Sequence, residues 1–137
     1  MNTGRTPGVI AKETTRIEAF SDGVFSIAIT LLIIELVGVL HSKDEEGLVK
    51  LLLHHWQSLF AFLVGFLTIL ICWINHHLVF TYIHKVDSKL MWINAFVLLM
   101  VTYTPFPTAL LAEYFDKERN LAMAFFGFNY FLMALAA

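Results

Sequence analysis

The sequence predicts an all-α membrane protein, a helical bundle with four transmembrane spans. Hydrophobic residues make up 58% of the 137 positions and the mean hydropathy is +0.72, whereas soluble domains hold about 45–50% apolar residues. Four apolar stretches approach or exceed the roughly 20 residues that a helix needs to cross the hydrocarbon core. The polar links between them are short, so consecutive spans are expected to pack as antiparallel neighbours.

The predicted elements follow one another along the chain. A polar stretch with Gly4, Pro7 and Gly8 predicts a flexible tail over residues 1–15, and residues 16–137 then form one transmembrane domain. The spans are expected at residues 17–40, 51–83, 90–112 and 121–137.

The two later spans carry further signals. Pro105 and Pro107 are expected to break or bend the third span, because each proline removes a backbone donor and clashes with the preceding turn. The fourth span is still apolar at Ala137 and has no polar flank. That pattern favours a chain truncated at its C-terminus.

Composition and motifs exclude several function classes. A net charge of −2 without a basic block gives no electrostatic footprint for nucleic acid. The sequence contains no HExxH, GxSxG, P-loop or GxGxxG motif, so we expect no enzyme activity. Paired histidines, among them His76 and His77, raise a haem-binding alternative. Because haem needs ligands on different helices and only one span is rich in histidine, we expect neither cofactor nor metal.

One side of the first span is a row of aliphatic residues. Ile27, Thr30, Leu31 and Ile34 fall on one face of a helical wheel. Such a row is either an ordinary packing face or a hydrophobic constriction around a symmetry axis. Periodicity does not distinguish the two.

Another side of the same span is polar. Asp22 lies about 140° from Ile27 on the wheel, and with Ser21 and Ser26 it is expected to face the protein or a neighbour. A carboxylate at this depth needs a partner. The candidates are Arg16, Asn75, His76, His77 and Asn94. Pairing of Asp22 with His77 would make the contact respond to pH.

Glu35 lies near the other end of the span. It is either an interfacial carboxylate that faces headgroups or a neighbouring helix or, if four copies surround an axis, part of an acidic ring that concentrates cations at a pore mouth.

Four ordered stretches resemble one known family. Arg16, Phe20, Ser21 and Asp22 form the pattern RxxxFSD. This pattern resembles the signature of the transmembrane protein 175 family, potassium channels of endolysosomes with smaller prokaryotic relatives. The similarity continues in CWINHHLVF (72–80), VDSKLMWINAFVLL (86–99) and TPFPTALLAEY (104–114). It therefore covers residues 16 to about 114.

The resemblance implies a potassium-selective channel in a prokaryotic cell membrane. It implies a homotetramer of subunits with six spans, of which four are visible here, and a central pore lined by the first helix. Ile27, Leu31 and Ile34 would form narrowing rings, and Thr30 a hydroxyl layer related to selectivity. A packing network would comprise Arg16, Phe20, Ser21, Asp22, Trp73, His77 and Asn94.

The absence of a TVGYG sequence bears on how such a channel would select ions. Without a carbonyl-lined filter, selectivity for potassium over related monovalent cations is expected to come from dehydration cost and pore diameter, and to be moderate. The alternative functions are a non-conducting membrane scaffold and a truncated relative of the channel.

Overall fold

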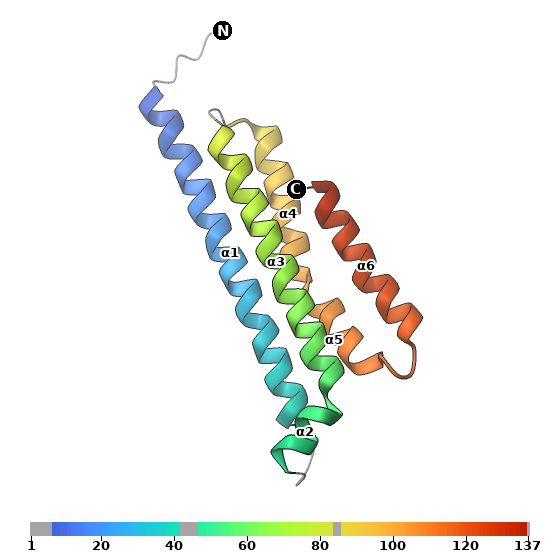
Figure 1. Ribbon diagram of the computed structural model, residues 1–137. Helices are drawn as coiled ribbons and strands as arrows, with labels where there is room; N and C mark the ends of the chain where they lie inside the picture. Colours follow the sequence, from blue (N-terminus) through green and yellow to red (C-terminus); the bar gives the residue numbers. More distant parts are fainter. Residues whose placement is uncertain (1–6, 42–46, 84–85, 137) are drawn as a thin grey trace.

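The computed structural model describes residues 7–41, 47–83 and 86–136. Every regular element in these residues is a helix, which confirms the predicted all-helical fold (Figure 1). The helices are α1 (Pro7–His41), α2 (Leu48–His54), α3 (Trp56–Tyr82), α4 (Ser88–Tyr103), α5 (Pro105–Tyr114) and α6 (Arg119–Ala136).

Three helical stretches in the described part of the chain are long and apolar enough to cross a membrane: Thr14–Gly38 in α1, Trp56–Tyr82 in α3, and Ser88–Tyr114, which joins α4 and α5. The predicted fourth span corresponds to α6, which is a helix but is not among these three stretches. α6 begins with Arg119 and Asn120, and such polar residues lower the hydropathy of a helix.

α1 begins earlier than the composition of its first residues predicts. Pro7 opens the helix, where proline is favoured because its missing N–H would be unpaired in the first turn anyway. The following alanine, lysine and glutamate residues are good helix formers. The structure therefore has helix over residues 7–15, where a tail was expected, and residues 1–6 lie outside the described residues.

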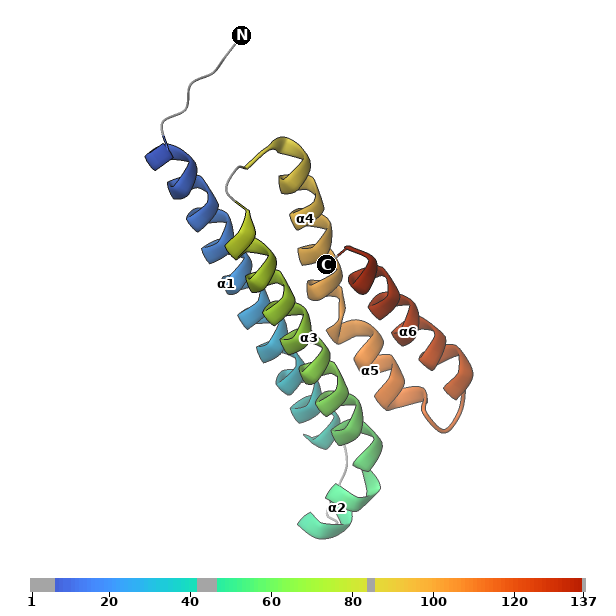
Figure 2. The same ribbon diagram turned by 45° about the horizontal axis from the view of Figure 1, so that its top comes forward.

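Two of the predicted spans are interrupted. The second is split at His55 into the short α2 and the long α3. The third is split at Thr104, as the two prolines predicted. Pro105 has no N–H to offer the Val101 carbonyl, which instead accepts from the N–H of Thr104 at 3.2 Å. As a result α5 leaves the line of α4 (Figure 2).

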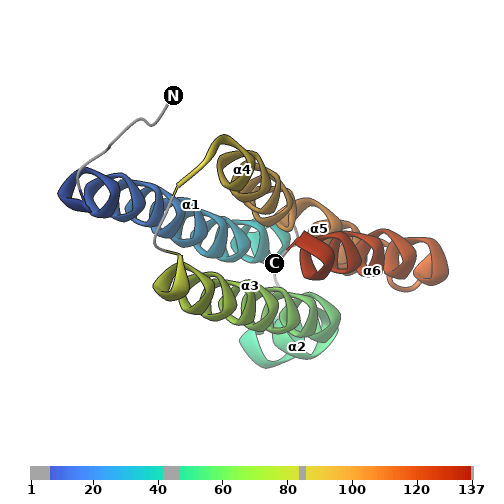
Figure 3. The same ribbon diagram turned by 90° about the horizontal axis from the view of Figure 1, so that it is seen from above.

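α1 lies among the other helices of the bundle. It packs against α3, α4 and α5, and α6 packs against α4 and α5. Seen from above, α3 and α4 lie on different sides of α1 (Figure 3). The end of α3 and the start of α4 lie at the same end of the bundle as the N-terminal part of α1 (Figure 1). This arrangement brings the polar half of α1 close to both helices.

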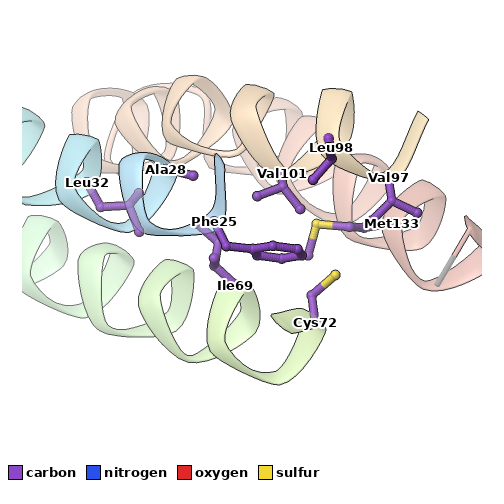
Figure 4. Close-up of a cluster of buried hydrophobic side chains, with 9 residues drawn as sticks. All are labelled: Phe25, Ala28, Leu32, Ile69, Cys72, Val97, Leu98, Val101 and Met133. Atoms are coloured by element: carbon purple, nitrogen blue, oxygen red, sulfur yellow. The ribbon is translucent and has the colours of Figure 1, made fainter. Parts of the chain in front are cut away.

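A buried apolar cluster joins four of the helices, with the Phe25 ring at its centre (Figure 4). Its members are Phe25, Ala28, Leu32, Ile69, Cys72, Val97, Leu98, Val101 and Met133. Inside a bilayer such contacts stabilise through van der Waals packing, since lipid tails are as apolar as the side chains.

Candidate functional site

α1 has one buried side and one exposed side. The buried row is at most 8% exposed and follows the i, i+4, i+7 spacing of a helix face. It consists of Ser21, Phe25, Ala28, Leu32 and Leu36. On the opposite side, Ile27 and Ile34 are 59% and 62% exposed, and Thr30 and Leu31 are exposed with them. The aliphatic row found in the sequence is thus not covered by the described residues of this chain.

The exposed row of α1 also includes a glycine and a hydroxyl. No atom lies within 4 Å of the position that a Cβ on Gly23 would occupy. The Thr30 hydroxyl donates to the Ile27 carbonyl at 2.8 Å. Because its hydrogen is held by the backbone, the Thr30 oxygen presents only lone pairs to its surroundings.

A buried polar cluster ties α1 to α3 and α4. The Asn94 carboxamide donates to Ser21 Oγ at 3.1 Å, and its oxygen lies 2.7 Å from His76 Nε2. Ser21 donates in turn to the Ile17 carbonyl at 2.9 Å. Asn94, Ser21 and His76 are all buried, so these hydrogen bonds replace part of what water would have made, and His76 Nδ1 is left without a partner among the described residues.

A second set of polar contacts joins α1 to α3 through two side-chain pairs, one turn apart. Trp73 Nε1 donates to Asp22 Oδ1 at 2.8 Å, and His77 Nδ1 lies 3.0 Å from Glu18 Oε1. The two carboxylates are one turn apart on α1, and the two rings are one turn apart on α3. The rings also stack, with centroids 5.9 Å apart at 23°. These two side-chain pairs therefore fix both the rotation and the register of α1 against α3.

The pairing differs in detail from the sequence-based hypothesis. His77 pairs with Glu18 instead of Asp22, so that part of the hypothesis is wrong. His76, not His77, is the imidazole that meets Asn94. Ser26 is exposed in the single chain and donates to the Asp22 carbonyl at 2.9 Å, so of the two expected surroundings it does not have the interior of its own chain.

Sequence reasoning left Glu18 out of the network, and it named Trp73 as a member without identifying its indole as the partner of Asp22. A signal for both was present. Glu18 precedes Asp22 by four residues, and Trp73 precedes His77 by four, so each pair shares a helix face.

Three other candidates lie apart from these contacts. Arg16 and Phe20 are exposed and line a groove beside the start of α4. Arg16 makes no hydrogen bond or ion pair with any residue that the structure describes. Glu35 is exposed on the distant half of α1, beside Ser58 and Thr108.

The described side chains do not form an obvious metal site. Within residues 7–41, 47–83 and 86–136, no three His, Cys, Asp or Glu side chains converge in a way that would hold a metal ion.

Comparison with known proteins matches the part of the chain that contains the contacts between α1, α3 and α4. The family model described as "Endosomal/lysosomal potassium channel TMEM175" matches residues 16–105. The chain is 52% identical over 103 residues to a protein from Chamaesiphon minutus named potassium channel, covering 74% of this chain and 51% of that protein. It is 47% identical over 126 residues to a potassium channel of Streptomyces collinus, covering 90% and 61%. The chain thus spans about half to three fifths of the length of these two relatives.

A solved structure shares the fold. The crystal structure of a lysosomal potassium-selective channel TMEM175 homologue from Chamaesiphon minutus superposes with a TM-score of 0.82 at 41% identity, covering 91% of this chain and 68% of that one. Together with three apolar helices long enough to span a bilayer, these bacterial relatives identify an integral protein of a prokaryotic membrane. The chain belongs to the TMEM175 family.

Proposed function

We propose that this chain is a subunit of a potassium-conducting channel, a homotetramer whose pore is lined by the exposed row of α1. The proposal rests on the difference in burial between two opposite sides of α1. One side is buried and held by hydrogen bonds to α3 and α4, and the opposite side presents Ile27, Leu31 and Ile34 outward. Relatives named potassium channels support the same activity.

The polar contacts give the pore helix its orientation in this proposal. A rotation of α1 by one residue, about 100°, would break the hydrogen bonds of Ser21 and Asp22 and bury other groups in their place. The resulting unpaired polar groups would be costly within a membrane. Four copies of α1 around an axis would therefore present the same row toward the axis.

Conduction in this arrangement depends on wetting of a hydrophobic constriction. Rings of Ile27 and Leu31 leave no polar ligands for an ion, so the pore would have to widen and fill with water before potassium could pass. Thr30 lies between these rings on the same row. Its outward lone pairs offer a partial substitute for hydration water, which would favour the cation that is less costly to dehydrate.

Glu35 has a separate role in the proposal. It lies toward the far end of α1 and is exposed. Carboxylates from four subunits would raise the local concentration of cations at that mouth of the pore.

Ion flux from liposomes tests the proposal. Purified protein is reconstituted under matched potassium and sodium gradients, and wild type is compared with Ile27→Asn. We expect potassium-favouring flux in wild type, with Ile27→Asn raising total flux or reducing the preference for potassium, because a polar ring wets more easily.

Ile71→Asn is the matched control. Ile71 is 57% exposed, almost the same as Ile27, but it lies on α3. If both variants change flux equally, α1 has no special place in the pore. If neither variant nor wild type conducts although the protein is folded and oligomeric, the scaffold alternative is favoured over the channel.

A further inference from the structure

A groove of about 840 Å³ runs between the N-terminal part of α1 and the start of α4. It does not belong to the exposed row of α1 or to the buried polar cluster, although Asn94 lies at its wall. The lining residues used below are Arg16, Phe20, Asp87, Met91, Ala95 and Leu98.

The groove runs from the membrane surface into the apolar region. Arg16 and Asp87 lie at the beginnings of the membrane-spanning stretches Thr14–Gly38 and Ser88–Tyr114. Leu98 lies ten residues beyond the start of α4, about 15 Å deeper at the rise of an α-helix. The exposed Trp92 and Tyr82 lie near the same end, where aromatic side chains mark the level of the headgroups.

The groove is lined by one cationic side chain, Arg16, and one anionic side chain, Asp87, which do not form an ion pair with each other. The Arg16 guanidinium has no hydrogen-bonding or ionic partner among the described residues, and it is exposed near the end of its membrane-spanning stretch, so it is available to a ligand at the membrane surface. The Asp87 carboxylate uses one oxygen to cap α4, accepting from the Leu90 N–H at 2.8 Å. Among the described residues that line the groove, Arg16 and Asp87 are the charged ones, and together they carry no net charge.

We propose that this groove binds a zwitterionic aminophospholipid such as phosphatidylethanolamine. The lipid phosphate pairs with Arg16, whose planar guanidinium matches phosphate oxygens. The lipid ammonium donates to Asp87. One acyl chain lies along the apolar wall that Phe20, Met91, Ala95 and Leu98 form deeper in the groove.

The choice of headgroup follows from the two charges. A phosphatidylglycerol headgroup would satisfy Arg16 but would bring a second negative group close to Asp87. Phosphatidylcholine would supply a positive charge without an N–H donor for the carboxylate. Of these three headgroups, only ethanolamine supplies both the phosphate and the ammonium donor.

Native mass spectrometry of the purified 137-residue protein tests this inference. The protein is titrated with phosphatidylethanolamine, phosphatidylglycerol or phosphatidylcholine of identical acyl chains. We expect phosphatidylethanolamine to bind most tightly and Arg16→Gln to weaken it about tenfold, the effect of one charge-assisted hydrogen bond. Asp87→Asn, which keeps an oxygen for the cap, should abolish the preference for phosphatidylethanolamine over phosphatidylglycerol.

Two further variants test whether the groove itself holds the lipid. Ala95→Trp fills the apolar part of the groove without changing charge, and should weaken the binding of all three lipids. Lys89→Gln removes a nearby exposed cation that does not line the groove, and should leave lipid binding unchanged.

Several outcomes would overturn the inference. Equal binding by wild type and Arg16→Gln would do so, as would a wild-type preference for phosphatidylglycerol. Loss of the oligomer in Ala95→Trp without any change in bound lipid would assign the groove to a neighbouring subunit instead. The readout is independent of ion flux, so a silent channel leaves the result interpretable.

Discussion

Asn94 is the residue on which the buried contacts between α1, α3 and α4 converge. Its amide donates to Ser21 on α1 and its carbonyl oxygen accepts from His76 on α3. A single carboxamide therefore satisfies polar groups on two other helices. No apolar residue of the same size can replace it, because removing one partner leaves the other buried without a hydrogen bond.

Asn94→Ala is expected to lower the free energy of unfolding by about 1–3 kcal/mol, the cost of leaving buried polar groups unpaired. Unfolding in mixed micelles of increasing sodium dodecyl sulfate measures this. Asn75→Ala is the control, because Asn75 lies on α3 but is exposed. Equal losses in the two variants would contradict the structural role assigned to Asn94.

The contact between Asp22 and Trp73 provides a second prediction at this scale. Trp73→Phe removes the donor and leaves a half-buried carboxylate unpaired, so it should destabilise by about 1–3 kcal/mol. The double variant Asp22→Leu/Trp73→Phe removes both polar groups and should be more stable than Trp73→Phe alone. The same micelle titration measures both, and a double variant that is the least stable of the set would refute the pairing.

At the scale of helices, Gly65 controls how closely α3 approaches its neighbours. A Cβ at this position would lie 3.2 Å from Thr108 Oγ1 on α5 and 3.4 Å from Leu32 Cδ1 on α1. Close approach through a small residue is a common way for membrane helices to gain packing contacts. One glycine thus allows α3 to contact both α1 and α5.

Gly65→Val should destabilise by about 1–3 kcal/mol, because the added methyl groups overpack this contact. Gly127→Val makes the same chemical change on α6, where no atom lies within 4 Å of the Cβ position. It should leave stability unchanged or raise it slightly, since glycine is a poor helix former. Apparent melting temperatures in one detergent compare the two, and equal shifts would mean that the contact at Gly65 does not limit packing.

The helices and their polar contacts differ in how far the sequence predicts them. The length of the apolar stretches predicted the long helices. The two prolines predicted the break at Thr104, because a proline disrupts the hydrogen bonds of its own helical turn whatever the rest of the fold. Helical spacing placed Trp73 and His77 on one face but did not single out Trp73 as the partner of Asp22, since His76 lies on that face as well and the register between two helices depends on packing. The start of α1 at Pro7 was missed because a polar composition describes a surface helix as well as a tail.

At the scale of the whole molecule, exposed apolar side chains cover several faces. Exposure alone does not separate lipid-facing residues from those at a subunit contact. Symmetry supplies the missing criterion, because a residue meets its own copy in a ring of identical subunits only where it lies close to the axis. The proposed pore places Ile27 in that position, and residues such as Ile71 on α3 away from it.

Cysteine cross-linking applies this criterion directly. In a Cys72→Ala background, which removes the only native thiol, Ile27→Cys and Ile71→Cys are treated in membranes with a short bis-maleimide. Ile27→Cys should give covalent dimers on a denaturing gel, since each thiol reacts once with one neighbour around the axis. Ile71→Cys, equally exposed in the single chain, should stay monomeric. Cross-linking at position 71 but not at 27 would place α3, and not α1, at the axis.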